Sequence, residues 1–131
     1  MIELNFSTSK QFDIIDITEE VKKAIKDSKM KNGLVIIYTP HATAAIIINE
    51  SWDPKVGEDF LDALDRVVPL HAGWRHDTVD NNAAAHIKSA IVGPSEIILL
   101  ENGELHLGTW QQIALVDFDG PRKRRVLVKI L

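Results

Sequence analysis

Three segments of the chain repeat apolar residues at the three- and four-residue spacing of an amphipathic helix. They cover roughly residues 17–32, 53–68 and 82–91. Asp16 or Thr18 is suited to cap the first helix, and Gly33 is expected to end it because glycine accepts the left-handed conformation. We expect the apolar residues between 56 and 67 to place the second helix against a core.

Strand-like stretches fill most of the remaining chain, at residues 2–6, 12–15, 34–38, 43–49, 95–100, 105–107, 111–118 and 124–131. The run 34–38 is continuously apolar, which predicts a strand buried on both faces. Asn102 and Gly103 form a strong hairpin signal. Because strands outnumber helices and mostly neighbour one another in sequence, we expect an α+β fold. It would be a largely antiparallel sheet packed with about three helices, in a single compact domain spanning residues 1–131.

Composition narrows the class of protein. The 131 residues include no cysteine, which excludes disulfides, thiolate metal sites and cysteine nucleophiles. A net charge of −4 argues against a nucleic-acid surface, and we interpret the basic run 122–125 as a solvated or anion-binding strand end. No apolar run approaches the ~20 residues that span a bilayer, and the first residues lack the order of a signal peptide. We expect a cytoplasmic protein that binds neither nucleic acid nor membranes.

Three of the five histidines lie among other polar groups, namely His41, His76 and His86. Imidazole is a common metal ligand and the usual acid–base group near neutral pH. No two of the three have the close spacing of a helical metal motif, so two interpretations stay open. Each could be a structural histidine bonded to backbone at the end of an element, or all three could share one site. His71 and His106 carry less chemical signal.

Two carboxylates are candidates for chemistry. Glu50 follows an apolar strand that would deliver it to the rim of a sheet, where it could bind a metal or act as a base. It could equally stabilise the start of the second helix by a few tenths of a kcal/mol to about 1 kcal/mol. Asp119 lies in a rigid turn beside Arg122, whose guanidinium can bond bidentately to phosphate or carboxylate.

Two further segments could contact a substrate. On the third helix Lys88 and Ser89 could hold a phosphate, although Lys88 also suits a solvated helix charge. In the 108–111 loop Trp110 could stack on a flat ring, while Thr109 and Gln111 hydrogen-bond to its edge. A strand bulge with a core tryptophan is the structural alternative.

Taken together and in order, these segments closely resemble the secondary thiamine-phosphate synthase family, also called the YjbQ-like or UPF0047 family. The matching segments are Thr39-Pro-His-Ala-Thr-Ala-Ala, Asn49-Glu50, Asp53-Pro54, Trp74-Arg-His, Asn82 with Ala85-His-Ile-Lys-Ser, Gly93-Pro-Ser, Leu107-Gly-Thr-Trp-Gln and Phe118-Asp-Gly-Pro-Arg. They span nearly the whole chain, and in register they are highly specific. Two residues depart from the pattern: Ala42 replaces a common threonine, and Asp117 replaces a frequent glutamate.

The resemblance implies an α+β domain that assembles as a homotrimer, with sites near subunit contacts. It also implies that His41, His76 and His86 converge around a divalent metal, either zinc-like at the histidines or magnesium with the substrate. The implied activity is a weak thiamine phosphate synthase, a transferase that joins a pyrimidine methyl pyrophosphate to a thiazole phosphate and releases pyrophosphate. Its catalytic residues would be Glu50, His41 and Asp119. Its substrate-binding residues would be Asn82, Lys88, Ser89, Thr109, Trp110, Gln111 and Arg122.

Two other functions are consistent with the same residues. Three histidines suit a zinc-like ion better than magnesium, which prefers oxygen ligands, and this favours a metal-dependent hydrolase or lyase acting on a phosphorylated metabolite. The other is a trimeric protein that binds a metal or a small molecule without turnover.

Overall fold

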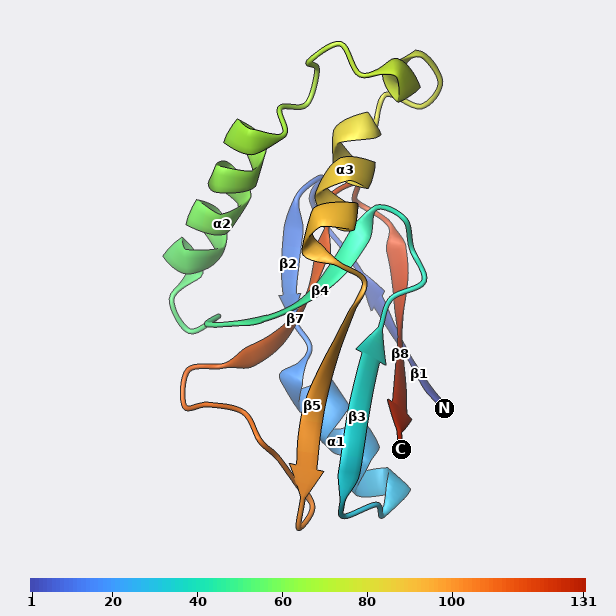
Figure 1. Ribbon diagram of the computed structural model, residues 1–131, viewed down its shortest axis with the longest axis vertical. Coiled ribbons are helices and arrows are strands. Elements are labelled where there is room, and N and C mark those ends of the chain that lie inside the picture. Colours follow the sequence, from blue (N-terminus) through green and yellow to red (C-terminus); the bar gives the residue numbers. More distant parts are fainter.

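The computed structural model describes residues 1–131 as an α+β fold built on two antiparallel sheets (Figure 1). The strand order is β1-β8-β3-β5-β6 in the large sheet and β2-β7-β4 in the small one. The strands are β1 (Ile2–Ser7), β2 (Asp13–Asp16), β3 (Gly33–Tyr38), β4 (Ala44–Asn49), β5 (Ser95–Glu101), β6 (Glu104–Leu105), β7 (Gln112–Asp117) and β8 (Lys123–Ile130). The helices are α1 (Thr18–Ser28), α2 (Pro54–Val67), the one-turn 3₁₀ helix η1 (Arg75–Thr78) and α3 (Ala83–Val92). The predicted fold class and antiparallel pairing are confirmed.

The small sheet lies in the middle of the layers. One of its faces joins α1 and the large sheet in the main hydrophobic core, where Val21, Ile46 and Leu115 are all buried. Its other face packs on α3 and part of α2, with Ala85 of α3 against Val116 of β7. Because both faces are covered, β4 and β7 are the strands with continuous buried runs.

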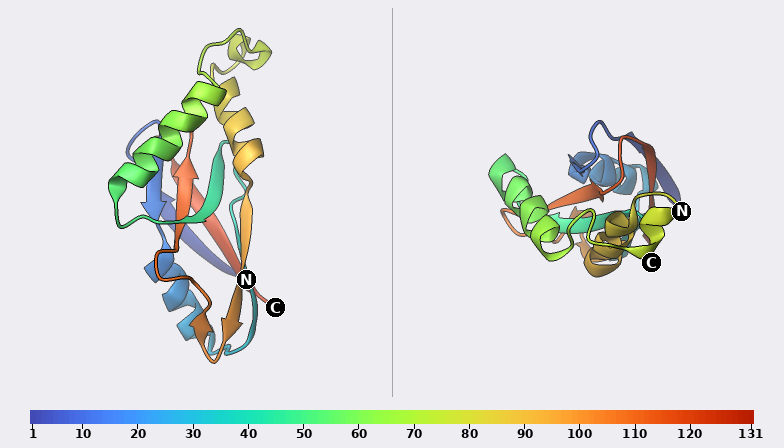
Figure 2. Two further views of the ribbon diagram at one scale, coloured as in Figure 1. Left: turned by 60° about the vertical axis from the view of Figure 1, so that its left-hand side comes forward. Right: turned by 90° about the horizontal axis from the view of Figure 1, so that it is seen from above.

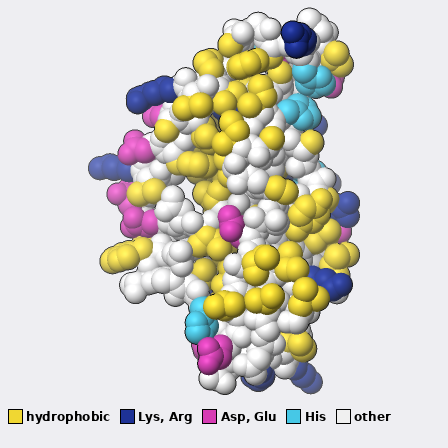
Figure 3. Space-filling view, in the orientation of Figure 1, with side chains coloured by type: hydrophobic (Ala, Val, Ile, Leu, Met, Phe, Trp, Pro, Cys, Tyr) yellow, Lys and Arg dark blue, Asp and Glu magenta, His cyan; other side chains and the backbone are white.

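One face of β3 is uncovered, so the prediction of burial on both faces was wrong. Val35 and Ile37 are buried, but Leu34 is 41% exposed. On the neighbouring strand β5, Leu99 lies opposite Leu34 and is 57% exposed, and Ile97 is exposed too. A run of β-branched residues favours a strand but carries no information on how many faces a neighbour covers. Apolar side chains therefore gather on the surface over β3 and β5 (Figure 3).

Helix α1 begins at Thr18, but its N-cap is Ile17 and no side chain makes a capping bond, so the prediction that Asp16 or Thr18 caps the helix was wrong. Asp16 instead accepts hydrogen bonds from the backbone N–H and the hydroxyl of Thr18. The helix ends earlier than expected, at Lys29, which takes the left-handed conformation with φ of 61°. Gly33 instead opens β3, where a Cβ would lie 2.0 Å from the backbone oxygen of Leu131. The glycine is required for a close approach of two chain segments rather than for a helix end.

Helix α2 packs loosely, and the expected core face from 56 to 67 is only half-buried. No residue of the helix is fully buried, and Val67 is 73% exposed. The helix comes close to the small sheet at Gly57, where a Cβ would lie 3.1 Å from the side chain of Ile14. Figure 2 shows α2 along the outside of the molecule, leading to the η1 segment at one end. No helix of the fold has the length and apolar character that crossing a bilayer requires.

The predicted hairpin at Asn102 and Gly103 is confirmed. Both residues have positive φ, 52° and 80°, and they join β5 to β6 with Glu101 paired to Glu104. The 69–81 stretch, expected to be irregular, contains the short helix η1 and projects from one end of the molecule (Figure 1).

Candidate functional site

The three histidines lie along one end of the molecule, around helix α3. His76 of η1 and His86 of α3 meet edge to face, with ring centroids 4.9 Å apart. His41 follows β3 and lines one surface pocket together with His86, while His76 and His86 line a second. His86 therefore connects the two pockets.

His41 is bonded to backbone at the end of a strand. The backbone N–H of Arg125 donates to its Nε2 at 3.0 Å, and the hydroxyl of Thr39 donates to the Arg125 carbonyl at 2.9 Å. The loop thus continues the pairing of β3 with β8 through side chains. Because Nε2 accepts this bond, the neutral ring carries its proton on Nδ1. Burial lowers the pKa of His41, and the charges of Arg124 and Arg125 lower it further, which keeps the ring neutral.

Four of the expected site residues come together at the start of α3. The side-chain amide of Asn82 donates to the Asp119 carboxylate at 2.8 Å, and Arg122 donates to the same oxygen at 3.1 Å. His86 lies one turn along α3 and its N–H bonds to the Asn82 carbonyl, so the two share a helix face. The amide oxygen of Asn82 is buried and has no partner. Residues 37 positions apart in sequence thus form one polar cluster.

Lys88 and Ser89 are placed away from this cluster. Lys88 is only 2% exposed, so the alternative of a solvated helix charge was wrong. Its ammonium bonds to Asp65 of α2 at 3.1 Å and lies 4.5 Å from the centre of the Phe12 ring. Ser89 donates to the carbonyl of Ala44. These contacts tie α3 to α2 and to β4.

Glu50 and the 109–111 loop lie at the opposite end of the small sheet from His41. In the β4–β7 register, Ala44 pairs with Asp117 near the histidines, and Asn49 pairs with Gln112 beside Glu50. Ala44 and Asn49 stand at the two ends of β4, and at about 3.3 Å per residue they are roughly 17 Å apart. Trp110 is 64% exposed, so the alternative of a core tryptophan was wrong. Within one chain, Glu50 and Trp110 cannot reach the histidines.

The whole chain matches one family model, that of the UPF0047 protein YjbQ-like family, over residues 2–131. The chain belongs to the YjbQ-like UPF0047 family. A UPF0047 protein of Archaeoglobus fulgidus is 45% identical to this chain, and the match covers 99% of this chain and 100% of the relative. The UPF0047 protein YugU of Bacillus subtilis is 43% identical, and the match covers 98% of this chain and 96% of the relative.

Solved structures of the YjbQ-like family share this fold. A YjbQ/UPF0047 protein from Clostridium acetobutylicum, described as uncharacterized and conserved, superposes with a TM-score of 0.96 at 46% identity and covers both chains fully. A protein of unknown function from Sulfolobus solfataricus superposes with a TM-score of 0.95 at 36% identity, covering 98% of this chain and 94% of its own. These relatives establish the family and the fold.

The side chains of one YjbQ-like chain do not fit a three-histidine metal site. No group of three or more histidine or carboxylate side chains lies close enough to hold an ion. His41 also uses its Nε2 lone pair to accept from Arg125, so that nitrogen is not free to ligate. The donors within one chain therefore do not form the expected chelate.

The polar cluster rests on a buried ion pair that the sequence analysis missed. Arg124 donates twice to Asp117, at 3.1 and 2.7 Å, and both side chains are buried. The backbone N–H of Asp119 and the hydroxyl of Thr8 also donate to Asp117, so the carboxylate anchors the turn that carries Arg122. The signal that would have predicted this pair is the presence of two charged residues, Asp117 and Arg124, at strand positions where the pattern predicts burial.

Proposed function

We propose that this YjbQ-like protein is a transferase of the secondary thiamine-phosphate synthase type, acting at the α3 end of the fold. The observation that carries the proposal is the cluster of Asn82, Asp119 and Arg122 beside the His76–His86 pair. The family resemblance assigns Asn82 and Arg122 to substrate, Asp119 to catalysis and the two histidines to a metal. Their juxtaposition supplies hydrogen-bond donors and a guanidinium to a phosphorylated substrate.

The chemistry requires positive charge at the leaving group. As pyrophosphate departs from the pyrimidine methyl carbon, negative charge builds on its oxygens, and donors aimed at those oxygens stabilise the transition state. The Nε and one terminal nitrogen of Arg122 are held by Asp119, which orients the guanidinium and leaves its other terminal nitrogen for a ligand. Arg75 and His76 line the adjoining pocket. This end of the protein therefore suits two phosphorylated substrates.

A divalent metal need not be held by the histidines. Since one chain does not form the three-histidine chelate, we derive no step of the reaction from a metal. A magnesium ion that arrives with pyrophosphate is compatible with this site, because magnesium takes many of its oxygen ligands from phosphates and water.

We further propose that the protein assembles as a homotrimer whose subunits share each site. The uncovered apolar face of β3 and β5, which includes Leu34, Ile97 and Leu99, supports assembly because monomers seldom expose contiguous apolar patches. A neighbouring subunit could supply Glu50 and Trp110, which the fold keeps at the opposite end of the small sheet from His41 of their own chain.

Replacing Arg122 by alanine should lower turnover of the two thiamine precursors by about tenfold to a hundredfold, since one preorganised donor to the leaving group is lost. The measurement is steady-state formation of thiamine phosphate by purified protein. Lys23→Ala, which removes an exposed cation of α1, is the matched control and should keep wild-type turnover. Wild-type turnover in the Arg122 variant would contradict the assignment.

A shared site predicts complementation between two inactive variants. Arg122→Ala and Glu50→Ala subunits, co-expressed so that they assemble together, should recover about a quarter of wild-type turnover, because one interface in four combines both intact residues in a cyclic assembly. If both residues came from the same chain, the mixture would stay as inactive as the separate variants.

A non-catalytic binder is the second candidate. Two observations favour a binder: His41 is already hydrogen-bonded to the backbone of Arg125, and Glu50 lies at the far end of the small sheet. Two of the residues assigned to catalysis are therefore not together within one chain. Retained binding of thiazole phosphate with no turnover, in a protein whose Arg122 variant no longer binds it, would support the binder over the synthase.

A further inference from the structure

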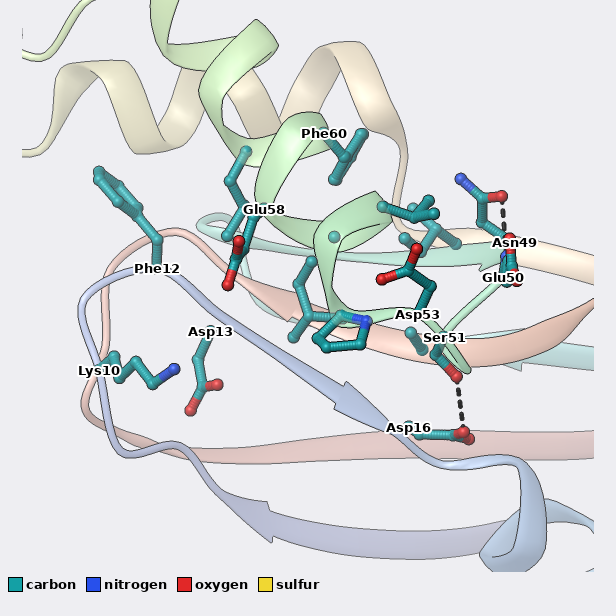
Figure 4. A pocket seen from close by; sticks show the side chains of 17 residues that line it. Lys10, Phe12, Asp13, Asp16, Asn49, Glu50, Ser51, Asp53, Glu58 and Phe60 are labelled. Carbon is teal, nitrogen blue, oxygen red and sulfur yellow. Dashed lines mark hydrogen bonds between the residues drawn. The ribbon is translucent and has the colours of Figure 1, made fainter.

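A cavity of about 260 Å³ lies between helix α2 and strands β2 and β4, away from the histidines (Figure 4). Its inner wall is apolar and includes Ile14 of β2, Ile47 of β4, and Phe60 and Leu61 of α2. Gly57 also lines it, and a Cβ at that position would lie 3.1 Å from the side chain of Ile14. The volume is slightly below the usual range of small-molecule sites, about 300–1,000 Å³, and suits a small ligand.

Acidic side chains surround this apolar wall. The lining includes one lysine, Lys10, and five carboxylates: Asp13, Asp16, Glu50, Asp53 and Glu58. None of the five takes part in a salt bridge of the fold, and neither does Lys10. The cavity therefore has a strongly negative rim around an apolar interior.

Three of the carboxylates already have structural partners. Asp16 accepts from Thr18 and Ser51, and Asp53 caps the first turn of α2 by accepting from the N–H of Lys55. Asp13 likewise accepts from Ser9. By capping α2, Asp53 also offsets the positive end of the helix dipole, which would otherwise favour an anion in the cavity.

Two carboxylates of the lining, Glu50 and Glu58, have no partner within one chain, and of these Glu58 is the one that the proposed transferase site does not use. Neither carboxylate accepts a hydrogen bond or an ion pair from the protein, and they come from different walls of the cavity, the end of β4 and helix α2 (Figure 4). No three carboxylates converge closely enough to hold a metal ion. Charge complementarity with an apolar wall thus points to an organic cation rather than to an inorganic one.

We propose that this cavity binds a small organic cation, an ammonium group carried on an apolar or aromatic skeleton. The ammonium would pair with Glu58 of α2, and the skeleton would lie on Phe60 and Ile47. An anionic ligand would meet five carboxylates, so a phosphorylated metabolite is repelled here and directed to the α3 end. The cavity is therefore a second site with the opposite charge preference.

The test uses three probes that share a ring and differ in charge: 2-phenylethylamine, 2-phenylethanol and phenylacetate. Titration calorimetry of the full-length protein at low ionic strength should show the amine binding about tenfold more tightly than the alcohol, since a charge pair near a protein surface is worth about this much. Phenylacetate should show no binding, and added salt should lower the affinity for the amine because it screens the charge interaction. Equal affinity for amine and alcohol would overturn the proposal.

Variants locate the binding. Glu58→Gln should lower the affinity for the amine about fivefold or more. Glu20→Gln, which changes an exposed carboxylate of α1, should leave this affinity unchanged. Backbone amide shifts in nuclear magnetic resonance should change at residues 47–61 and 12–16. Shifts confined to other residues, or an unaltered affinity in Glu58→Gln, would refute the assignment. Because Arg122→Ala should keep amine binding, failure of the transferase proposal and failure of this one are distinguishable.

Discussion

Replacing Asp117 by asparagine is expected to lower the free energy of unfolding by about 3–5 kcal/mol at neutral pH, because it leaves Arg124 buried without its charge partner. The carboxylate is fully buried and accepts hydrogen bonds from Nε and Nη2 of Arg124. It also accepts from the Thr8 hydroxyl at 2.7 Å and from the Asp119 N–H at 2.9 Å. An amide cannot accept all of these bonds. Urea unfolding followed by circular dichroism measures the loss.

The loss should shrink in acid. Burial by itself raises the pKa of Asp117, but the hydrogen bonds from Arg124, Thr8 and Asp119 and the charge of Arg124 together bring the pKa below its usual value. A carboxyl with a lowered folded pKa contributes stability above its unfolded pKa of about 3.9, and this is lost as pH falls through the folded pKa. Unfolding curves at pH 7 and at pH 3 should therefore show wild type and variant converging in acid.

Two controls separate an unpaired charge from general disruption. Asp59→Asn, an exposed carboxylate of α2, should change stability by no more than about 0.5 kcal/mol. The double variant Asp117→Leu with Arg124→Met should be markedly more stable than Asp117→Asn, since no buried charge is left without a partner. If Asp117→Asn cost less than about 1 kcal/mol, or the double variant were the less stable of the two, the ion pair would not anchor the turn.

The second large effect is expected at the proposed subunit interface. Replacing Leu99 by aspartate should raise the dissociation constant of the homotrimer at least about a hundredfold, because a carboxylate buried between subunits without a partner costs several kcal/mol. Leu99 lies opposite Leu34 on the uncovered sheet face, so the change falls within the apolar patch. Sedimentation equilibrium over a range of protein concentrations measures the assembly.

Met30→Asp is the matched control, because Met30 is an exposed apolar residue just outside β3 rather than on the sheet face. Its assembly should match that of the wild type. A wild-type protein that is monomeric at micromolar concentration, or a Leu99→Asp variant that assembles normally, would show that the β3–β5 face is not the contact. The shared-site proposal would then lose its structural support.

The sequence by itself determined the elements and the class of fold. Helical spacing located all three helices, alternation and turn residues located the strands, and the Asn102–Gly103 pair located the hairpin. These signals are local, since a helix repeats every 3.6 residues and a two-residue turn depends on its own φ angles. The order of the polar segments also pointed to the family that the comparisons established.

Only the tertiary structure decided which faces are covered and which polar residues meet. The exposure of Leu34 depends on what packs over β3, and the bond of His41 depends on a strand 84 positions away. The same holds for Asn82 with Asp119, and for Glu50, which β4 carries to the far end of the sheet. Periodicity records the face that a residue occupies on its own element, whereas contacts between elements are set by sheet order and register, which no local pattern encodes.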